Sequence, residues 1–139
     1  MAVFILDTTT LTHLQRKHPR VTDALDNHTG DVVGTTKVNV EEVVGGWIAL
    51  IRRSKTNGQE ARASAYVAAA MEIMAPLVVF AKSEAALDRF DQLVRLKLNV
   101  GKMDLKIAAV ALGLDATVVT DNAIDFGRVP GLKWEDWTV

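Results

Sequence analysis

The chain has 139 residues and a formal net charge of −1, a length that fits one domain over residues 1–139. It has no cysteine, which excludes disulfides, thiolate zinc sites and cysteine nucleophiles and suits a reducing cytoplasm. No apolar run approaches the roughly 20 residues that span a bilayer, and the N-terminus lacks the pattern of a signal peptide. We therefore expect a cytoplasmic domain without a membrane segment, on which any nucleic-acid surface is local or assisted by a cation.

The first part of the chain alternates short apolar runs with segments of helical character. Val3–Leu6 and Val32–Thr36 predict strands, because both are short and rich in β-branched residues. Between them, the threonines at 8–10 can cap a short helix over residues 10–17, and a second helical piece surrounds Val21. We expect a strand, two short helices and a strand in this order.

A helical hairpin is predicted next. Apolar residues recur at the helical period within 41–53, residues 54–58 form a polar break, and residues 61–74 are alanine-rich and helical. Pro76 ends the second helix, and the apolar run over residues 77–80 predicts a third strand.

The second half repeats the alternation of helices and strands. Ser83 is placed to cap a helix over residues 84–98, and a further helix covers residues 103–112. Residues 117–120 form a strand of the buried type, and Lys133–Glu135 is the last predicted strand. Apolar strands separated by helices indicate an α/β fold with a parallel sheet.

Acidic side chains follow or flank these strands. Ligands of parallel α/β folds bind beyond the carboxyl ends of the strands, so acids placed there can converge on one site. The candidates come from four separate segments: Asp7 after the first strand, Glu41 and Glu42 in the helix after the second, Asp104 in the helix before the fourth, and Asp121 and Asp125 after the fourth.

Each of these acids alone can be explained as a turn, cap or first-turn helix residue. Together they repel one another, since two charges about 4 Å apart cost roughly 4 kcal/mol at an effective dielectric of about 20. A cation would relieve that repulsion, and oxygen ligands without histidine or cysteine indicate Mg²⁺ or Mn²⁺. Such a site can activate water and stabilise an in-line displacement at phosphorus.

Histidines and basic residues offer weaker signals. His13 and His18 are five residues apart, which does not place both on one helical face, and we interpret them as surface residues. Arg52 and Arg53 end a predicted helix and Lys102 begins another. A solvated helix end explains them, and contact with RNA phosphates is the functional alternative.

Four segments resemble the motifs of PIN-domain ribonucleases, and in particular the VapC-type toxins of VapBC toxin–antitoxin pairs. FILDTT resembles the first motif and ends in Asp7, and GKMDLKIAAVALGL places a third acid at Asp104. VNVEEVVGG resembles the second motif, whose glutamate is followed by an aliphatic residue and, four positions on, by a glycine; that spacing selects Glu42 over Glu41. VVTDNAIDFGRVPGLKWEDW resembles the ending of VapC-type toxins, and the likeness runs from Met1 to Val139.

The resemblance implies a three-layer α/β/α sandwich with a five-stranded parallel sheet. It implies a Mg²⁺-dependent endoribonuclease that cuts tRNA or another structured RNA, forms a homodimer and is neutralised by a VapB-type antitoxin. Asp7 and Asp104 would hold the metal, and Glu42 would hold a second metal or deprotonate the attacking water. The family pattern favours Asp125 as the fourth acid, whereas Asp121 lies nearer the end of the strand.

Thr8, Thr120 and Asn122 are the expected hydrogen-bond partners of the ligating carboxylates. Two alternatives stay open. One is a non-catalytic binding module with the same fold. The other is a receiver-like phosphoacceptor domain, which needs an aspartate after its third strand, where this chain has Ala81 and Lys82.

Overall fold

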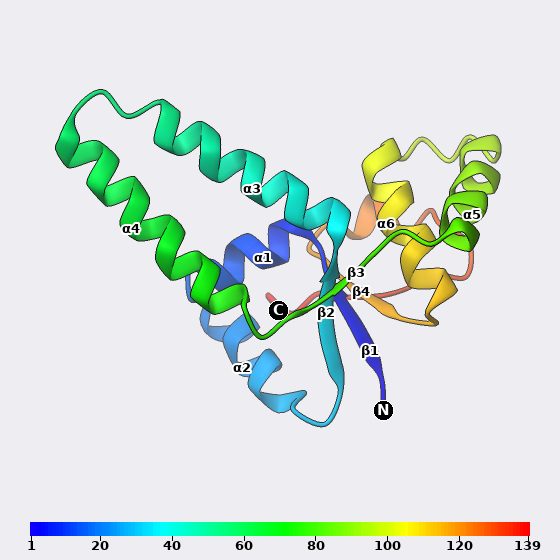
Figure 1. Cartoon of the computed structure of the whole chain (residues 1–139). Coiled ribbons are helices and arrows are strands. Elements are labelled where there is room, and N and C mark those ends of the chain that lie inside the picture. The colour runs from blue at the N-terminus through cyan, green and yellow to red at the C-terminus, as the bar shows by residue number, and fades with distance from the viewer.

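Five parallel strands form a single sheet in the order β3-β2-β1-β4-β5, shown in Figure 1 as a computed structural model that describes residues 1–139. The strands are β1 (Val3–Leu6), β2 (Val32–Thr36), β3 (Val78–Phe80), β4 (Thr117–Val119) and β5 (Lys133–Glu135). The predicted α/β fold with a five-stranded parallel sheet is confirmed.

Seven helices connect the strands. They are α1 (Thr8–Gln15), α2 (Pro19–Asn27), α3 (Lys37–Arg52), α4 (Asn57–Met74), α5 (Glu84–Arg95), α6 (Lys102–Gly113) and α7 (Ala123–Phe126). The helical hairpin predicted for the middle of the chain is α3 and α4, which project together from one side of the sheet (Figure 1). No helix in the chain is both long enough and apolar enough to cross a membrane.

Three helices begin earlier than predicted, because a side chain just before each of them caps its first turn. Asp7, and not one of the threonines at 8–10, caps α1 by accepting the Thr10 N–H at 2.9 Å. Thr36, the last residue of β2, accepts the Asn39 N–H at 3.2 Å, so α3 begins four residues before the predicted position 41. Thr56 caps α4 in the same way.

The sheet separates two apolar cores, as its alternating side chains require. Ile5 and Val118 face the core shared with α5 and α6, whereas Phe4, Leu6 and Val119 face the core shared with α1 and α2. Helices therefore cover both faces of the sheet, and the expected three-layer arrangement is confirmed.

The central strand β1 lies between β2 and β4, and the strand order reverses there. The chain continues from β1 to β2 and β3 on one side and reaches β4 and β5 on the other. Leu6 is in register with Val119, and the backbone N–H of Asp7 donates to the Val119 carbonyl at 3.1 Å. Asp7 thus lies at the switch point where open parallel sheets bind their ligands.

Gly34 in β2 has no room for a side chain. A Cβ atom there would lie 2.3 Å from the Val78 carbonyl oxygen and 2.8 Å from the Phe80 ring. We expect Gly34→Ala to reduce the free energy of unfolding by about 1–3 kcal/mol, because strand β3 must shift. Gly45→Ala in α3, where no atom lies within 4 Å, should instead stabilise the helix by about 0.5–1 kcal/mol. Thermal melting measures both changes, and equal melting temperatures for the two variants would contradict this packing.

Candidate functional site

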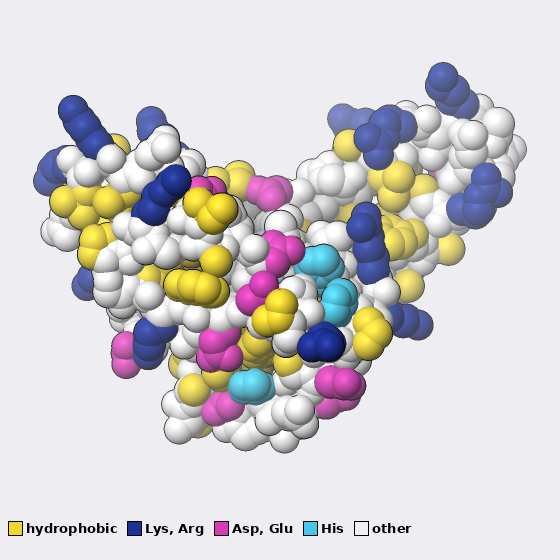
Figure 2. Space-filling model, turned by 180° about the vertical axis from the view of Figure 1, so that it is seen from behind, with side chains coloured by type: hydrophobic (Ala, Val, Ile, Leu, Met, Phe, Trp, Pro, Cys, Tyr) yellow, Lys and Arg dark blue, Asp and Glu magenta, His cyan; other side chains and the backbone are white.

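A cleft of about 130 Å³ opens at the carboxyl end of β1. Its lining comes from the start of α1, from α3, from α6 and from the loop after β4: Asp7, Thr8, Thr9, Asn39, Glu42, Asp104, Ile107 and Asn122. Figure 2 shows the molecule hollowed between the α3–α4 arm and the α5–α6 side, with acidic side chains near the middle and Lys and Arg on both sides. Three of the six candidate acids, Asp7, Glu42 and Asp104, line this one cleft.

Asp7 is buried, with 5% of its surface exposed. Its Oδ1 accepts the backbone N–H of Thr10 and the hydroxyl of Thr9, each at 2.9 Å. Its Oδ2 makes no hydrogen bond within the chain. One oxygen therefore fixes the orientation of the carboxylate, while the other stays available to a ligand in the cleft.

The two adjacent glutamates of α3 have different surroundings. Glu41 forms an ion pair with Lys37 at 3.1 Å, and the hydrogen bond and charge of Lys37 lower the pKa of Glu41. Glu42 lines the cleft and has no hydrogen bond or ion pair within the chain. Because successive helix residues point in directions about 100° apart, only Glu42 can serve the cleft.

Asp104 lies half-buried in the first turn of α6 and has no hydrogen-bonding partner. Its burial raises its pKa above the usual value of 3.8, and the charges of Asp7, Asp125 and Glu42 raise it further. The helix N-terminus favours the negative charge but does not outweigh these effects. A carboxylate held without a counter-charge in a cleft is typical of a ligand-binding position.

Two residues, Asp121 and Asp125, are candidates for the fourth acid of the site. Asp125 contributes to the raised pKa of Asp104 and accepts from Asn122 Nδ2 at 2.9 Å and from Arg128 at 3.3 Å. Asp121 is absent from the charges that act on Asp104. Electrostatically, Asp125 belongs with Asp7, Glu42 and Asp104, although neither Asp121 nor Asp125 lines the cleft.

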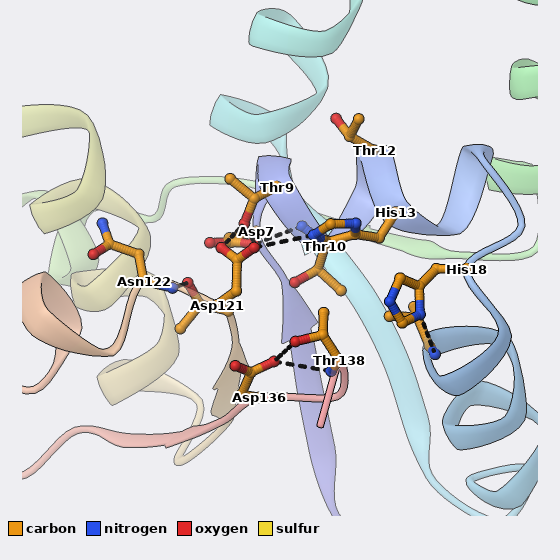
Figure 3. A network of polar contacts seen from close by, with 12 residues as sticks. Asp7, Thr9, Thr10, Thr12, His13, His18, Asp121, Asn122, Asp136 and Thr138 are labelled. Atoms are coloured by element: carbon orange, nitrogen blue, oxygen red, sulfur yellow. Dashed lines mark hydrogen bonds and ion pairs between the residues drawn. The ribbon is translucent and has the colours of Figure 1, made fainter.

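Asp121 belongs to a polar network beside the cleft (Figure 3). Its Oδ2 lies 3.0 Å from His13 Nε2, and its Oδ1 accepts the hydroxyl of Thr9 at 2.9 Å. The contact with His13 lowers the pKa of Asp121, and the Thr9 hydroxyl contributes to the same shift. Thr9 has one hydroxyl hydrogen for two carboxylates, Asp7 and Asp121, so it couples the two acids.

His13 thus makes a specific contact at the surface, which its interpretation as a surface residue did not include. Its partner is 108 positions away in the sequence, and no local pattern around His13 indicates that contact.

Of the three residues expected to bond to the carboxylates, only one does so. Asn122 does bond to a carboxylate, that of Asp125. Thr8 instead accepts from Asn39 Nδ2 at 3.1 Å, and Thr120 accepts the backbone N–H of Asn122 at 2.9 Å. The hydrogen bond to Asp7 that was expected of Thr8 is made by the next residue, Thr9.

Asn39 is a cleft residue that the sequence interpretation missed. It is 1% exposed, and its amide oxygen accepts the Thr36 hydroxyl at 2.7 Å. Its position three residues before Glu42 on α3 places both on one helical face, which is the signal that could have identified it.

The basic candidates lie outside the cleft. Lys102 is exposed at the start of α6, two residues before Asp104. Arg53, at the end of α3, lines a neighbouring hollow that also includes Thr8 and Glu42, and Arg52 does not line that hollow.

The donor set of the cleft suits a hard divalent cation. Asp7, Glu42 and Asp104 offer only carboxylate oxygens, and two of them have no partner within the chain. No three acidic or histidine side chains converge closely enough to ligate one ion together. Mg²⁺ commonly uses one or two carboxylates and keeps several waters, so the residues present fit it.

The sequence of this chain is similar to those of known proteins. The PIN domain family model matches residues 4–132. Ribonuclease VapC1 of Haemophilus influenzae (strain R2866) is 46% identical over 39 residues, which are 28% of this chain and 29% of that protein, so the match covers less than a third of the relative's length.

Two solved structures share the fold over nearly the whole chain. DNA-bound VapBC from Salmonella typhimurium is 26% identical with a TM-score of 0.77, covering 99% of this chain and 99% of that one. VapBC2 from Rickettsia felis, bound to a DNA fragment from their promoter, is 22% identical with a TM-score of 0.76, covering 97% and 98%. Since the family model spans almost all of the sequence, and the fold agrees with it, the chain belongs to the PIN domain family.

Proposed function

We propose that residues 1–139 form one nuclease domain, a Mg²⁺-dependent endoribonuclease that acts as the toxin of a type II toxin–antitoxin pair. The observation that carries the proposal is the pair of unpartnered carboxylates, Glu42 and Asp104, in one cleft with the half-satisfied Asp7. Such a pair costs stability in a protein that binds no cation there. The family match and the similarity to Ribonuclease VapC1 support the reaction class.

The side chains have distinct proposed roles in hydrolysis. Asp7 and Asp104 would hold the cation, and Asp7 is oriented for this by Thr9 and by the Thr10 backbone N–H. Glu42 is exposed and free, so it can accept the proton of the attacking water. When bound, the cation neutralises the acids and stabilises the charge that develops on the phosphate. Asp125, held by Asn122, completes the acidic set.

Unpaired RNA is the proposed substrate, in a tRNA or another structured RNA. A cleft of about 130 Å³ is too small for a duplex, whereas a single strand or loop can bend a phosphate into it. Contacts to phosphates position a strand without reading its sequence, so we infer that sequence preference comes from residues around the cleft.

The proposed protein partners are an antitoxin of the VapB type and a second copy of the chain. The structures of Salmonella typhimurium and Rickettsia felis are VapBC complexes, which supports the first. Exposed apolar side chains on contacting elements support the second: Val78 and Val79 on β3 are 46% and 53% exposed, and Ile48 on the neighbouring α3 is 45% exposed.

The adjacent glutamates give a matched test of the reaction. Glu42→Gln should lower kcat/KM for RNA cleavage in Mg²⁺ by about 100-fold or more, because the proton acceptor is lost. Glu41→Gln removes the same charge one residue away and should leave cleavage near the wild-type rate. Cleavage of total tRNA is measured with Mg²⁺ and with EDTA. Equal effects of the two substitutions, or cleavage that persists in EDTA, would refute the assignment.

Asp104 gives a test through stability. Its raised pKa means that the folded state disfavours the ionised carboxyl, so the cost is present at neutral pH and disappears as the pH falls through the folded pKa. Asp104→Asn should therefore melt slightly above the wild-type protein when no metal is added. Mg²⁺ should stabilise the wild type, by about 2.7 kcal/mol at roughly 100 times Kd, and the variant much less.

Calorimetry with and without Mg²⁺ measures this difference, and Asp88→Asn on α5, an exposed acid outside the cleft, is the control. A wild-type protein that Mg²⁺ leaves unchanged, beside an Asp104→Asn variant that is destabilised, would favour the non-catalytic binding module.

Light scattering tests whether the chain forms a homodimer. The chain is expected to have twice its single-chain mass, and Val79→Lys on the exposed edge strand should shift it to the single-chain mass, because a buried unpaired charge is costly. A single-chain mass for the wild type at micromolar concentration would contradict the homodimer.

A further inference from the structure

A groove continues from the acidic cleft between α1, α3 and α4. It consists of two adjoining hollows of about 370 Å³ each. The first shares Thr8 and Glu42 with the cleft, and the second shares Arg53 and Tyr66 with the first. A chain-like ligand that passes through the cleft therefore meets this groove directly.

The groove is positively charged along its length. Arg16, Arg53 and Arg62 line it, from α1, the end of α3 and α4. None of the three makes an ion pair, and their guanidinium groups make no hydrogen bond within the chain. Glu42, at the cleft end, is the only acid among the lining residues. Three unpaired guanidinium groups in a row match a ligand with repeated negative charge.

Two aromatic side chains line the same groove. Trp47 is half-buried, and Tyr66 is 37% exposed with its hydroxyl donating to Gln15 Oε1 at 3.3 Å. That hydrogen bond fixes the position of the Tyr66 hydroxyl, while part of the side chain stays exposed. Aromatic faces beside unpaired cations are the features with which proteins bind single-stranded nucleic acid.

We propose that this groove binds the single-stranded RNA on one side of the cut phosphate, with Arg53 contacting the backbone and Tyr66 offering a stacking face. The proposal rests on the proposed function and assigns the path of the substrate beyond the acidic cleft. Arg53 is central because it lines both hollows. The other candidate occupant is an acidic peptide segment of a protein partner. The groove is continuous with the cleft, so an RNA strand that is cut in the cleft extends into the groove. The arginines that line the groove match the negative charge of that strand, and this favours RNA over a peptide.

Two neighbouring arginines that look equivalent in the sequence have different surroundings in the structure. Arg52 and Arg53 are both exposed at the end of α3, and only Arg53 lines the groove. They form a matched pair for mutagenesis, because both are arginines, both are exposed and they are adjacent in the sequence.

The test measures binding of a fluorescent single-stranded oligoribonucleotide in EDTA, at several salt concentrations. Arg53→Ala should weaken binding by about tenfold or more, the loss of one charge-assisted contact. It should also reduce the salt slope by about 0.7, the value for one phosphate contact on a single strand. Arg52→Ala should change neither. Arg53→Lys keeps the charge and should restore most of the affinity.

Cleavage in Mg²⁺ gives a second readout. Arg53→Ala should raise KM by a similar factor with kcat unchanged, because the contact is present in the ground state and in the transition state alike. If Arg53→Ala lowers thermal stability, Arg62→Ala on α4 replaces it, with the same expectation.

The outcomes separate the two proposals. A wild-type chain that cleaves RNA, with Arg53→Ala and Arg52→Ala indistinguishable in affinity and KM, overturns the groove, leaves the nuclease standing and points to a peptide in the groove. A chain that binds the oligonucleotide through Arg53 but cleaves nothing supports the groove and overturns the nuclease. A wild-type chain that does not bind the oligonucleotide overturns the groove.

Discussion

The hydrogen bond from the Thr10 N–H to Asp7 Oδ1 is the contact on which the rest of the site depends. It lets one carboxylate end the central strand, cap α1 and present a free oxygen at the switch point of the sheet. Burial of a charged group is costly unless such donors satisfy it. Because Asp7 is held in this way, the other acids can be brought close to it from separate segments.

Electrostatic repulsion explains the arrangement around Asp7. Glu41 is paired with Lys37, and Asp115 is paired with Lys133. Glu42 and Asp104 lack such neighbours, so the cleft keeps a local negative charge in a chain whose net charge is only −1. Lys and Arg side chains stand on both sides of the hollow (Figure 2). A molecule with this charge pattern suits an anionic ligand bridged to the acids by a cation.

Helix phase decides between residues of identical chemistry. Glu41 and Glu42 differ by one position, as do Arg52 and Arg53, and in each pair only the second faces a cleft or groove. Thr8 and Thr9 both line the cleft, but only Thr9 bonds to Asp7, whereas Thr8 accepts from Asn39. A rotation of about 100° per residue is enough to move a side chain from one role to another.

Much of this protein follows from the sequence, because strand and helix periods are local properties. The parallel α/β fold, the hairpin of α3 and α4, and the acids at the strand ends needed only the pattern around each residue. The exposure of β3 was not predictable in that way, since its apolar run is the same whether the strand lies inside the sheet or at its edge. Helix starts depended on capping side chains in the preceding segments.

Tertiary structure alone decided the contacts between distant segments. The pairing of His13 with Asp121 joins residues 108 positions apart. The grouping of Asp125 with Asp104, the burial of Asn39 beside Glu42, and the groove between α1, α3 and α4 likewise depend on how elements pack. The sequence determined which side chains were available and roughly where each lay along its own element. Packing around the sheet determined which of them meet, because that depends on distances between elements that no local pattern encodes.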